Sequence, residues 1–222
     1  MNGPAALRVF YGGTFDPVHH GHLAIARAAH VTLGVPVALM PAADPPHRPP
    51  PGASAADRVA MLELALAGEP GLALDLRELA RPGRSYSVDT LRALRAELGE
   101  AAPLALLVGA DSFLGLPTWK AWEALLDLAH FVVAERAGSP LEAALAPPLA
   151  AAVAGRWCQD PAVLRRTPAG RVLRLRQPLH PQSASELRAR IGDGRPWRHL
   201  VPPAVADHIV ARGLYGLAVT GP

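Results

Sequence analysis

Three histidines lie within four positions of this 222-residue sequence, shortly after a pair of glycines. His19 and His22 are three residues apart, so at the start of a helix both side chains can project to the same side. Gly12 and Gly13 let a ligand approach the backbone closely, and the start of a helix offers N–H groups to an anion. Thr14 adds a hydroxyl donor. This combination favours an anionic ligand that carries phosphoryl groups.

Two other interpretations of these histidines are open. They could be surface residues of a loop, although three of them in four positions between a strand and a helix argue against that. His19, His20 and His22 could instead bind a metal ion. The stretch has neither an H-E-x-x-H pattern nor an evident carboxylate partner, however, so we favour phosphoryl binding.

The flanking residues predict the elements that hold this loop. An apolar run at 7–11 predicts a buried strand ending at the glycines, and residues 23–33 are typical of a helix. Ser54 and Ser87 are expected to cap two later helices. Further strands are predicted at 35–40, 72–76, 104–108, 131–134 and 172–175, and helices at 54–68, 87–98, 119–128, 183–191 and 203–212.

The alternation of strands and helices predicts an α/β fold with a doubly wound, mostly parallel sheet. Ligands of such sheets bind beyond the carboxyl ends of the strands, which is where the histidines fall. We expect one domain over residues 1–222, with a small C-terminal helical part at about 180–222. Residues 139–170 are rich in Ala and Pro, and the sequence assigns them no function.

The charge of the chain is mildly basic, with 22 Lys and Arg against 19 Asp and Glu, a formal net charge of +3. Lys120 is the only lysine, so phosphate binding must rest on Arg, His and backbone N–H groups. We expect no nucleic-acid partner, because a charge of this size spread along the sequence is not a basic stripe. The densest basic run is interpreted as a solvated strand edge rather than an RNA-binding surface: Arg165, Arg166, Arg171, Arg174 and Arg176.

Other features exclude several classes of protein. Cys158 is the only cysteine, so there is neither a disulfide framework nor a cysteine-based zinc site. No apolar run reaches the roughly 18 residues of a membrane span, and the first 30 residues lack a signal-peptide pattern. We therefore expect a cytoplasmic protein without a membrane partner. The chain also lacks the G-x-G-x-x-G dinucleotide fingerprint and the P-loop motif.

Several segments of the sequence resemble motifs of a known family. Residues 12–23 read GGTFDPVHHGHL, which resembles the signature of the H-x-G-H nucleotidyltransferase superfamily in the long form found in bacterial nicotinate-nucleotide adenylyltransferases. Later segments resemble further motifs of that family in the same order: PPHR at 45–48, SYSVDTL at 85–91, GADS at 109–112, TWKAW at 118–122 and SASELR at 183–188. The resemblance covers nearly the whole chain and implies a Rossmann-like nucleotidyltransferase fold.

The resemblance also implies a reaction. The 5′-phosphate of nicotinate mononucleotide would attack the α-phosphorus of ATP and release pyrophosphate, with Mg²⁺ on the ATP phosphates and no dedicated protein metal site. Both reactants are phosphates, so no protein nucleophile is needed. The enzyme must align two anions and stabilise the charge that develops on the phosphorus. The residues expected to do so are His19, His22, Thr14 and Arg188.

For ATP, the resemblance points to residues of the segments 12–22 and 183–188, together with Asp111 and Arg136. Ser183 and Glu186 also form a capping box, which is compatible with an anion site at that helix start. Asp111 could accept from ribose hydroxyls or could instead cap a helix. Two departures from the family pattern concern fine geometry, namely Gln182 at a usual Ile and Ser185 where Thr is common. After Arg136, Ala137 replaces the Pro that is often found next. The expected ATP-binding residues are Gly12, Gly13, Thr14, His19, His22, Asp111, Arg136, Ser183, Ser185 and Arg188.

For the acceptor, the expected residues are Phe15, His47, Ser87, Trp119 and Lys120. Trp119 would offer its face to the pyridine ring, although a Trp in the core is an equal alternative. Ser87, backbone N–H groups and Lys120 would favour the carboxylate of nicotinate over the neutral amide.

Three other functions are weighed against this one. The acceptor could be nicotinamide mononucleotide or phosphopantetheine, or the chain could be a non-catalytic nucleotide-binding module. A phosphopantetheine enzyme would lack the segments at 85–91 and 118–122, and 222 residues leave no room for the anticodon-binding parts of a tRNA synthetase. The sequence does not indicate the oligomeric state.

Overall fold

A computed structural model of the protein describes residues 6–43, 52–81, 83–135, 141, 144–177 and 182–217. Its described part contains one seven-stranded sheet in the order β3-β2-β1-β4-β5-β7-β6, and every neighbouring pair is parallel. The strands are β1 (Arg8–Gly13), β2 (Val37–Pro41), β3 (Leu72–Leu74), β4 (Leu104–Gly109), β5 (His130–Ala134), β6 (Trp157–Cys158) and β7 (Val172–Leu175). The predicted doubly wound parallel sheet is confirmed.

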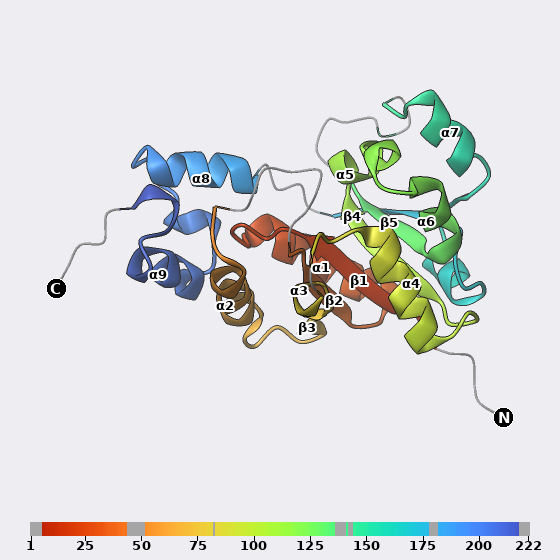
Figure 1. Ribbon diagram of the computed structural model, residues 1–222, viewed down its shortest axis with the longest axis horizontal. Helices are drawn as coiled ribbons and strands as arrows, with labels where there is room; N and C mark the ends of the chain where they lie inside the picture. Colours follow the sequence, from red (N-terminus) through yellow and green to blue (C-terminus); the bar gives the residue numbers. More distant parts are fainter. Residues whose placement is uncertain are drawn as a thin grey trace.

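Helices cover both faces of the sheet (Figure 1). One face carries α1 (His20–Leu33) and α2 (Ala55–Leu66), and the other carries α4 (Ser87–Leu98), α5 (Ala110–Leu114), α6 (Trp122–Leu128) and α7 (Pro147–Val153). To the left of the sheet in Figure 1, α8 (Ala184–Gly192) and α9 (Pro203–Ala211) extend the first of these layers, and α9 packs against α2. The remaining helical pieces are α3 (Arg77–Ala80) and the 3₁₀ turns Leu116–Thr118, Pro161–Arg165, Arg198–Leu200 and Leu214–Gly216. Both faces of the sheet are therefore buried.

The alternation of side chains along β1 shows how the two layers form. Val9 and Tyr11 join the apolar cluster beneath α1, whereas Phe10 joins the cluster beneath α4. Successive side chains of a strand point to opposite faces, so an uninterrupted apolar strand is what two covered faces require. α1 contributes Leu23 and Leu33 to the same core and ends at Gly34, whose φ of +61° stops the helix.

The strand order fixes the position of the ligand cleft. β1 lies between β2 and β4, and the chain leaves β1 toward one face of the sheet and β4 toward the other. At such a switch point the loops after the two strands separate and leave a crevice at the carboxyl edge of the sheet. The glycine turn after β1 and the start of α5 after β4 are the walls of that crevice.

Several predicted boundaries are wrong. The helix predicted at 119–128 begins only at Trp122, because Ala121 has a φ of +49° and interrupts it. Ser87 is the first residue of α4 and not its cap; Tyr86 holds the cap position without a side-chain hydrogen bond. Ser54 does cap α2, accepting from the N–H of Asp57 at 3.0 Å. The patternless stretch 139–170 contains α7 and β6, and α3 and α5 were not predicted.

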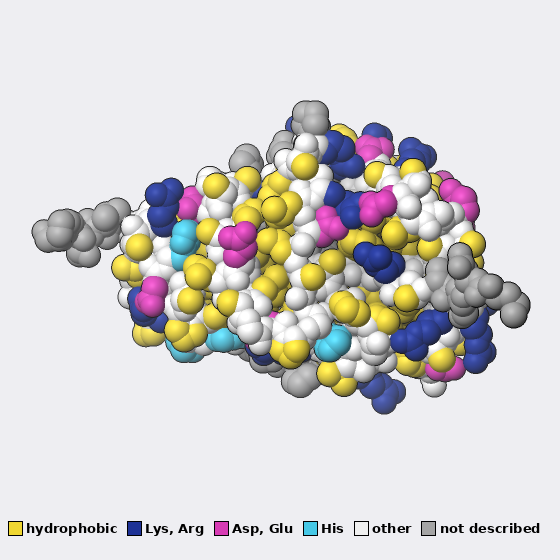
Figure 2. All heavy atoms as spheres, turned by 90° about the horizontal axis from the view of Figure 1, so that it is seen from below, with side chains coloured by type: hydrophobic (Ala, Val, Ile, Leu, Met, Phe, Trp, Pro, Cys, Tyr) yellow, Lys and Arg dark blue, Asp and Glu magenta, His cyan; other side chains and the backbone are white. Residues whose placement is uncertain are grey.

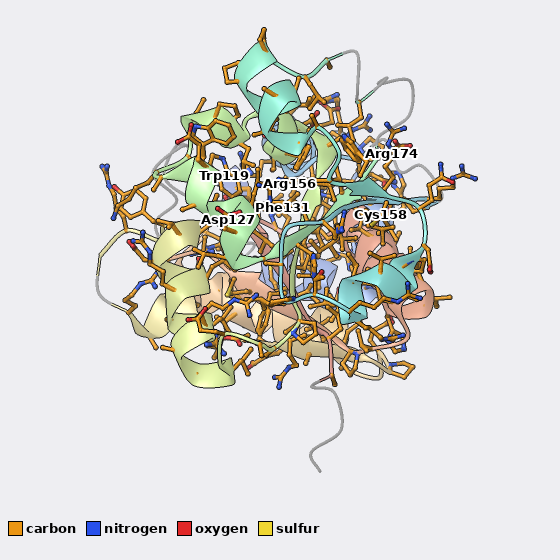
Figure 3. The ribbon with its side chains drawn as sticks, turned by 90° about the vertical axis from the view of Figure 1, so that its right-hand side faces the viewer. Trp119, Asp127, Phe131, Arg156, Cys158 and Arg174 are labelled. Carbon is orange, nitrogen blue, oxygen red and sulfur yellow. The ribbon has the colours of Figure 1, made fainter. Side chains whose placement is uncertain are left out.

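The basic run near β7 is drawn into local contacts. Arg165 donates to the carbonyl of Leu33, while Arg174 pairs with Glu135 at 3.7 Å and lies over the Trp157 ring at 4.9 Å (Figure 3). On the face seen in Figure 2, Lys and Arg side chains are interspersed with acidic and apolar ones. Within the described ranges, no helix is long and apolar enough to cross a bilayer.

Candidate active site

The glycine turn and the start of α1 place the two histidines in contact. His19 is the N-cap of α1, and its backbone N–H donates to Nδ1 of His22 at 3.3 Å. The two imidazole rings stack with their centroids 3.8 Å apart, and the Phe15 ring meets His22 edge-on at 5.1 Å. Because Nδ1 of His22 accepts a hydrogen bond, the neutral ring carries its proton on Nε2. His22 is therefore oriented as an N–H donor.

The stacking also bears on the metal alternative. Stacked rings face each other, so their nitrogens are not directed at one common point as metal ligands are. In the described part of the chain, no group of three or more His, Cys, Asp or Glu side chains is arranged to hold a metal ion.

Gly13 is required by the packing of the turn. A Cβ atom at this position would lie 2.9 Å from the Phe15 ring, closer than side chains tolerate. Phe15 itself is buried, with 1% of its surface exposed, and it packs edge-on against Tyr11 at 5.4 Å. The Phe15 ring thus packs against the glycine turn at Gly13 and orients His22.

Two cavities meet at this turn, and both are lined by Gly12, Gly13, Thr14, Asp111 and Ser112. The first has a volume of about 280 Å³ and lies toward α4; the second has about 600 Å³ and lies toward α8. A site for two ligands that react at one point needs this arrangement. The two cavities share these five residues as a common wall.

The structure distributes most of the predicted site residues over these two cavities. The first cavity is lined by Ser87, Trp119 and Lys120, three of the five residues predicted to bind the acceptor. The second is lined by Phe15, His19, His22, Ser183, Ser185 and Arg188. Phe15 was predicted on the acceptor side and lies instead in the wall of the second cavity. His47 and Arg136 are outside the described residues.

Three of these residues were given alternative structural roles, and the structure bears on each. Ser183 caps α8, because its hydroxyl accepts from the N–H of Glu186 at 3.2 Å. Asp111 lies within α5, whose cap is Gly109, so it is not a cap. Trp119 packs against the apolar cluster beneath α4 and also lines the first cavity, so the two alternatives are compatible.

Lys120 is engaged with residues of α4. Its Nζ lies 3.0 Å from a carboxylate oxygen of Asp89 and 4.5 Å from the centre of the Tyr86 ring. Both partners of the ion pair are partly exposed, so the pair is weak. The positive charge at this rim of the first cavity is therefore shared with Asp89 and is not reserved for a ligand.

Arg58 was missed by the sequence reasoning, although it holds the turn together. This guanidinium is 1% exposed and donates to three carbonyls, those of Thr14 at 2.8 Å, Ala42 at 2.7 Å and Ala43 at 3.2 Å. Burial lowers the pKa of Arg58, but an arginine remains charged at neutral pH. It links the ends of β1 and β2. Local sequence patterns do not indicate this role, because an arginine on an amphipathic helix ordinarily faces water.

Glu78 is a second missed residue, in the wall of the first cavity. It is 6% exposed, and its Oε1 accepts from the Thr90 hydroxyl at 2.7 Å. Burial raises the pKa of Glu78, against the effect of hydrogen bonds from Thr90 and Ser85. Ser85 in turn accepts from the N–H of Ala43 at 3.0 Å. This network joins α3, α4 and the segment that follows β2.

Comparison with known proteins agrees with this geometry. Residues 10–190 match the cytidylyltransferase-like family model. A protein of Stenotrophomonas maltophilia described as a probable nicotinate-nucleotide adenylyltransferase is 61% identical over 215 residues, covering 95% of this chain and 97% of that protein. A relative from Xylella fastidiosa strain M12 with the same description is 52% identical over 216 residues and 97% of its length. The chain belongs to the nicotinate-nucleotide adenylyltransferase family. The resemblance seen in the sequence is thereby confirmed.

Solved structures of this family share the fold at much greater distance in sequence. A nicotinic acid mononucleotide adenylyltransferase of Plasmodium falciparum, solved in complex with NaAD, aligns with a TM-score of 0.67 at 16% identity. The alignment covers 95% of this adenylyltransferase and 98% of that chain. A Rossmann-like nucleotidyltransferase fold is therefore maintained although few side chains are shared.

The buried acid of the first cavity makes a testable contribution to stability. Because the pKa of Glu78 is higher in the folded protein, the folded state binds more protons than the unfolded state, and the free energy of unfolding falls as pH rises. Glu78→Gln removes this titration and keeps an oxygen for Thr90. We expect the stability of the variant relative to wild type to increase from about pH 4 to pH 7, measured by urea denaturation.

Glu63→Gln, at an exposed position on α2, is the matched control, for which we expect no such trend. A stability difference for Glu78→Gln that stays constant over this range would contradict a raised pKa.

Proposed function

We propose that this adenylyltransferase transfers the adenylyl group of ATP to nicotinate mononucleotide and releases pyrophosphate, forming nicotinate adenine dinucleotide in NAD biosynthesis. The observation that carries the proposal is the pair of cavities that meet at one glycine turn beside the stacked histidines. Nicotinate mononucleotide would occupy the first cavity and ATP the second. Their phosphates would then meet at the wall formed by Gly12, Gly13 and Thr14.

The chemistry needs alignment more than it needs reactive side chains. An oxygen of the acceptor's 5′-phosphate forms a bond to the α-phosphorus of ATP while the bond from that phosphorus to the bridging oxygen of the β-phosphate breaks. The electron pair leaves with pyrophosphate. Positioning of the two reactants can lower such a barrier by roughly 7–11 kcal/mol. Donors aimed at the developing charge on the phosphoryl oxygens supply much of the remainder.

The protein's donors on the ATP side come from three segments. His22 and His19 lie at the start of α1, with His22 presenting its Nε2–H, and Thr14 lies in the turn. Ser183, Ser185 and Arg188 belong to the capped start of α8. We assign the phosphates of ATP to these groups, and ribose or base contacts to Asp111. The ATP-binding role of Arg136 stays a prediction.

Recognition of the acceptor's carboxylate is assigned chiefly to the start of α4. The first helical residue is Ser87, and the N–H groups of a first helical turn favour an anion. Trp119 would cover the pyridine ring, and Lys120 would add a positive charge that it shares with Asp89. The role of His47 stays a prediction.

A divalent cation fits this site as part of the substrate. The cavity offers hydroxyl, imidazole and guanidinium donors, which suit phosphate oxygens, and ATP itself supplies the oxygen ligands that Mg²⁺ prefers. We therefore propose the Mg²⁺ complex of ATP as the donor substrate. A single domain is also proposed, since α9 packs against α2 through the pairs of Asp57 with His208 and Arg212. The cytoplasmic location stays a prediction.

The function is tested by measuring pyrophosphate release from ATP and Mg²⁺ with three acceptors in turn: nicotinate mononucleotide, nicotinamide mononucleotide and phosphopantetheine. We expect release with nicotinate mononucleotide and much slower release with the other two. Preference for the amide or for phosphopantetheine would overturn the proposed acceptor, and no release with any of them would favour a binding module.

A second prediction concerns the stacked histidines. His22→Ala removes an oriented N–H donor from the second cavity, so turnover should fall by about 10²–10³-fold, as for other preorganised donors. Circular dichroism and thermal unfolding should show a folded protein.

His20→Ala is the matched control, because the same motif loses an imidazole that does not line either cavity. A His22→Ala variant that is unstable but retains wild-type turnover would assign His22 a structural role only.

A third prediction distinguishes the contribution of Lys120 to recognition of the acid from that of the start of α4. Lys120→Ala should lower the ratio of kcat/KM for nicotinate mononucleotide to that for nicotinamide mononucleotide by several-fold only, because Asp89 already shares the charge. Lys120→Arg should keep the ratio. If Lys120→Ala leaves this kcat/KM ratio unchanged, the lysine does not contribute to recognition of the acid, and the start of α4 must account for it.

A further inference from the structure

Asp16 is a buried carboxylate that gathers hydrogen bonds from distant segments of the chain. It is 3% exposed and lies three residues before His19. Its Oδ2 accepts from the N–H of Gly52 at 2.7 Å, and its Oδ1 accepts from the N–H of Ala53 at 3.0 Å. The Tyr215 hydroxyl donates to the same Oδ1 at 2.9 Å. The approach to α2 and the C-terminal turn at Leu214–Gly216 therefore meet beside the histidine turn.

Arg188 also contacts Asp16, but through the backbone. Its Nη1 donates to the carbonyl oxygen of Asp16 at 2.6 Å, whereas the carboxylate Oδ2 is 3.6 Å from the same nitrogen. The carboxylate already accepts from three other donors, so it does not hold the guanidinium in a close two-point pair. The Arg188 side chain remains 35% exposed and lines the second cavity.

Tyr215 is held in an unusual conformation by its surroundings. Its φ is +61°, a region that bulky residues rarely adopt and that is often found at functional sites. The ring lies against Gly52, where a Cβ atom would be 3.2 Å from the ring and 3.4 Å from Cδ of Arg188. Burial and the nearby Asp16 carboxylate raise the pKa of Tyr215, so its hydroxyl keeps the proton that it donates.

We propose that Tyr215 is a positioning residue for the nucleotide half of the site, and that its hydroxyl keeps Asp16 satisfied so that Arg188 stays directed at the phosphates of ATP. Without this hydroxyl a buried carboxylate loses one of its three donors, which is costly. Arg188 has its Nη1 3.6 Å from the Asp16 carboxylate, whereas Arg58 is held by three carbonyls. Arg188 would then turn toward Asp16 and away from the cavity. The proposal rests on the proposed function only in taking ATP as the occupant.

The proposal predicts an effect on one substrate. Neither Tyr215 nor Arg188 lines the first cavity. Tyr215→Phe removes the hydroxyl and keeps the ring, so we expect KM for ATP, and the Kd of the Mg²⁺ complex of ATP measured by calorimetry, to rise roughly tenfold. KM for nicotinate mononucleotide should change less than twofold. A general loss of structure would raise both.

A double-mutant cycle tests the route through Arg188. Arg188→Ala weakens ATP binding by itself, and adding Tyr215→Phe to it should produce little further change if the tyrosine acts through the arginine. A full additional tenfold loss in that background would overturn the proposal. So would a Tyr215→Phe variant whose Kd for the Mg²⁺ complex of ATP stays within twofold of wild type.

His208→Gln is the structural control, because it weakens the contact of α9 with Asp57 without touching Asp16. It should lower the melting temperature and leave the Kd for ATP unchanged. If Tyr215→Phe fails to fold, Gly52→Ala serves as the second variant. It adds a methyl group that presses on Tyr215 and on Arg188, and it should raise the same Kd.

Wild-type protein is measured first, so that two failures can be told apart. Absence of pyrophosphate release with all three acceptors would overturn the proposed function. The role of Tyr215 would still be decided by calorimetry with the Mg²⁺ complex of ATP, which does not depend on turnover.

Discussion

Buried carbonyl oxygens need hydrogen-bond donors, and one buried guanidinium donates to those of the turn after β1 and of the segment after β2. Arg58 is 1% exposed and donates to carbonyls at the ends of both β1 and β2. Burying a cation is costly, and these three hydrogen bonds offset part of that cost. The glycine turn, the histidine pair and both cavities depend on this contact, because it fixes where the turn begins.

The rest of the site also contains few positively charged side chains. Two polyanionic substrates must meet, yet the chain has a single lysine, which already pairs with Asp89. In the proposed assignment, attraction comes instead from helix starts at α1, α4 and α8, from imidazole N–H groups and from Arg188. These groups are fixed in direction by the backbone, so little reorganisation accompanies the reaction. The buried acids nearby are handled differently, since Asp16 is satisfied by donors whereas burial raises the pKa of Glu78.

Sequence reasoning succeeded where periodicity and local chemistry agree. The parallel sheet, the end of α4, the bounds of β7 and the cap at Ser183 were predicted correctly, because buried strands and capped helices leave local signals. It failed at Trp119 to Ala121, where an apolar pattern continues but Ala121 takes a left-handed conformation that no local rule requires. It also missed Arg58 and Glu78, since a charged residue on a helix normally indicates solvent.

The sequence by itself determined the fold class and the family, since each depends on residue types at fixed short spacings, and it predicted that the glycine turn binds phosphate. Only the tertiary structure decided which side chains share a cavity and which buried side chains support the glycine turn. Asp16 and Tyr215 are 199 positions apart and meet in one hydrogen bond. Such a pair leaves no local pattern, because the contact exists only after the sheet and its C-terminal helices have packed together.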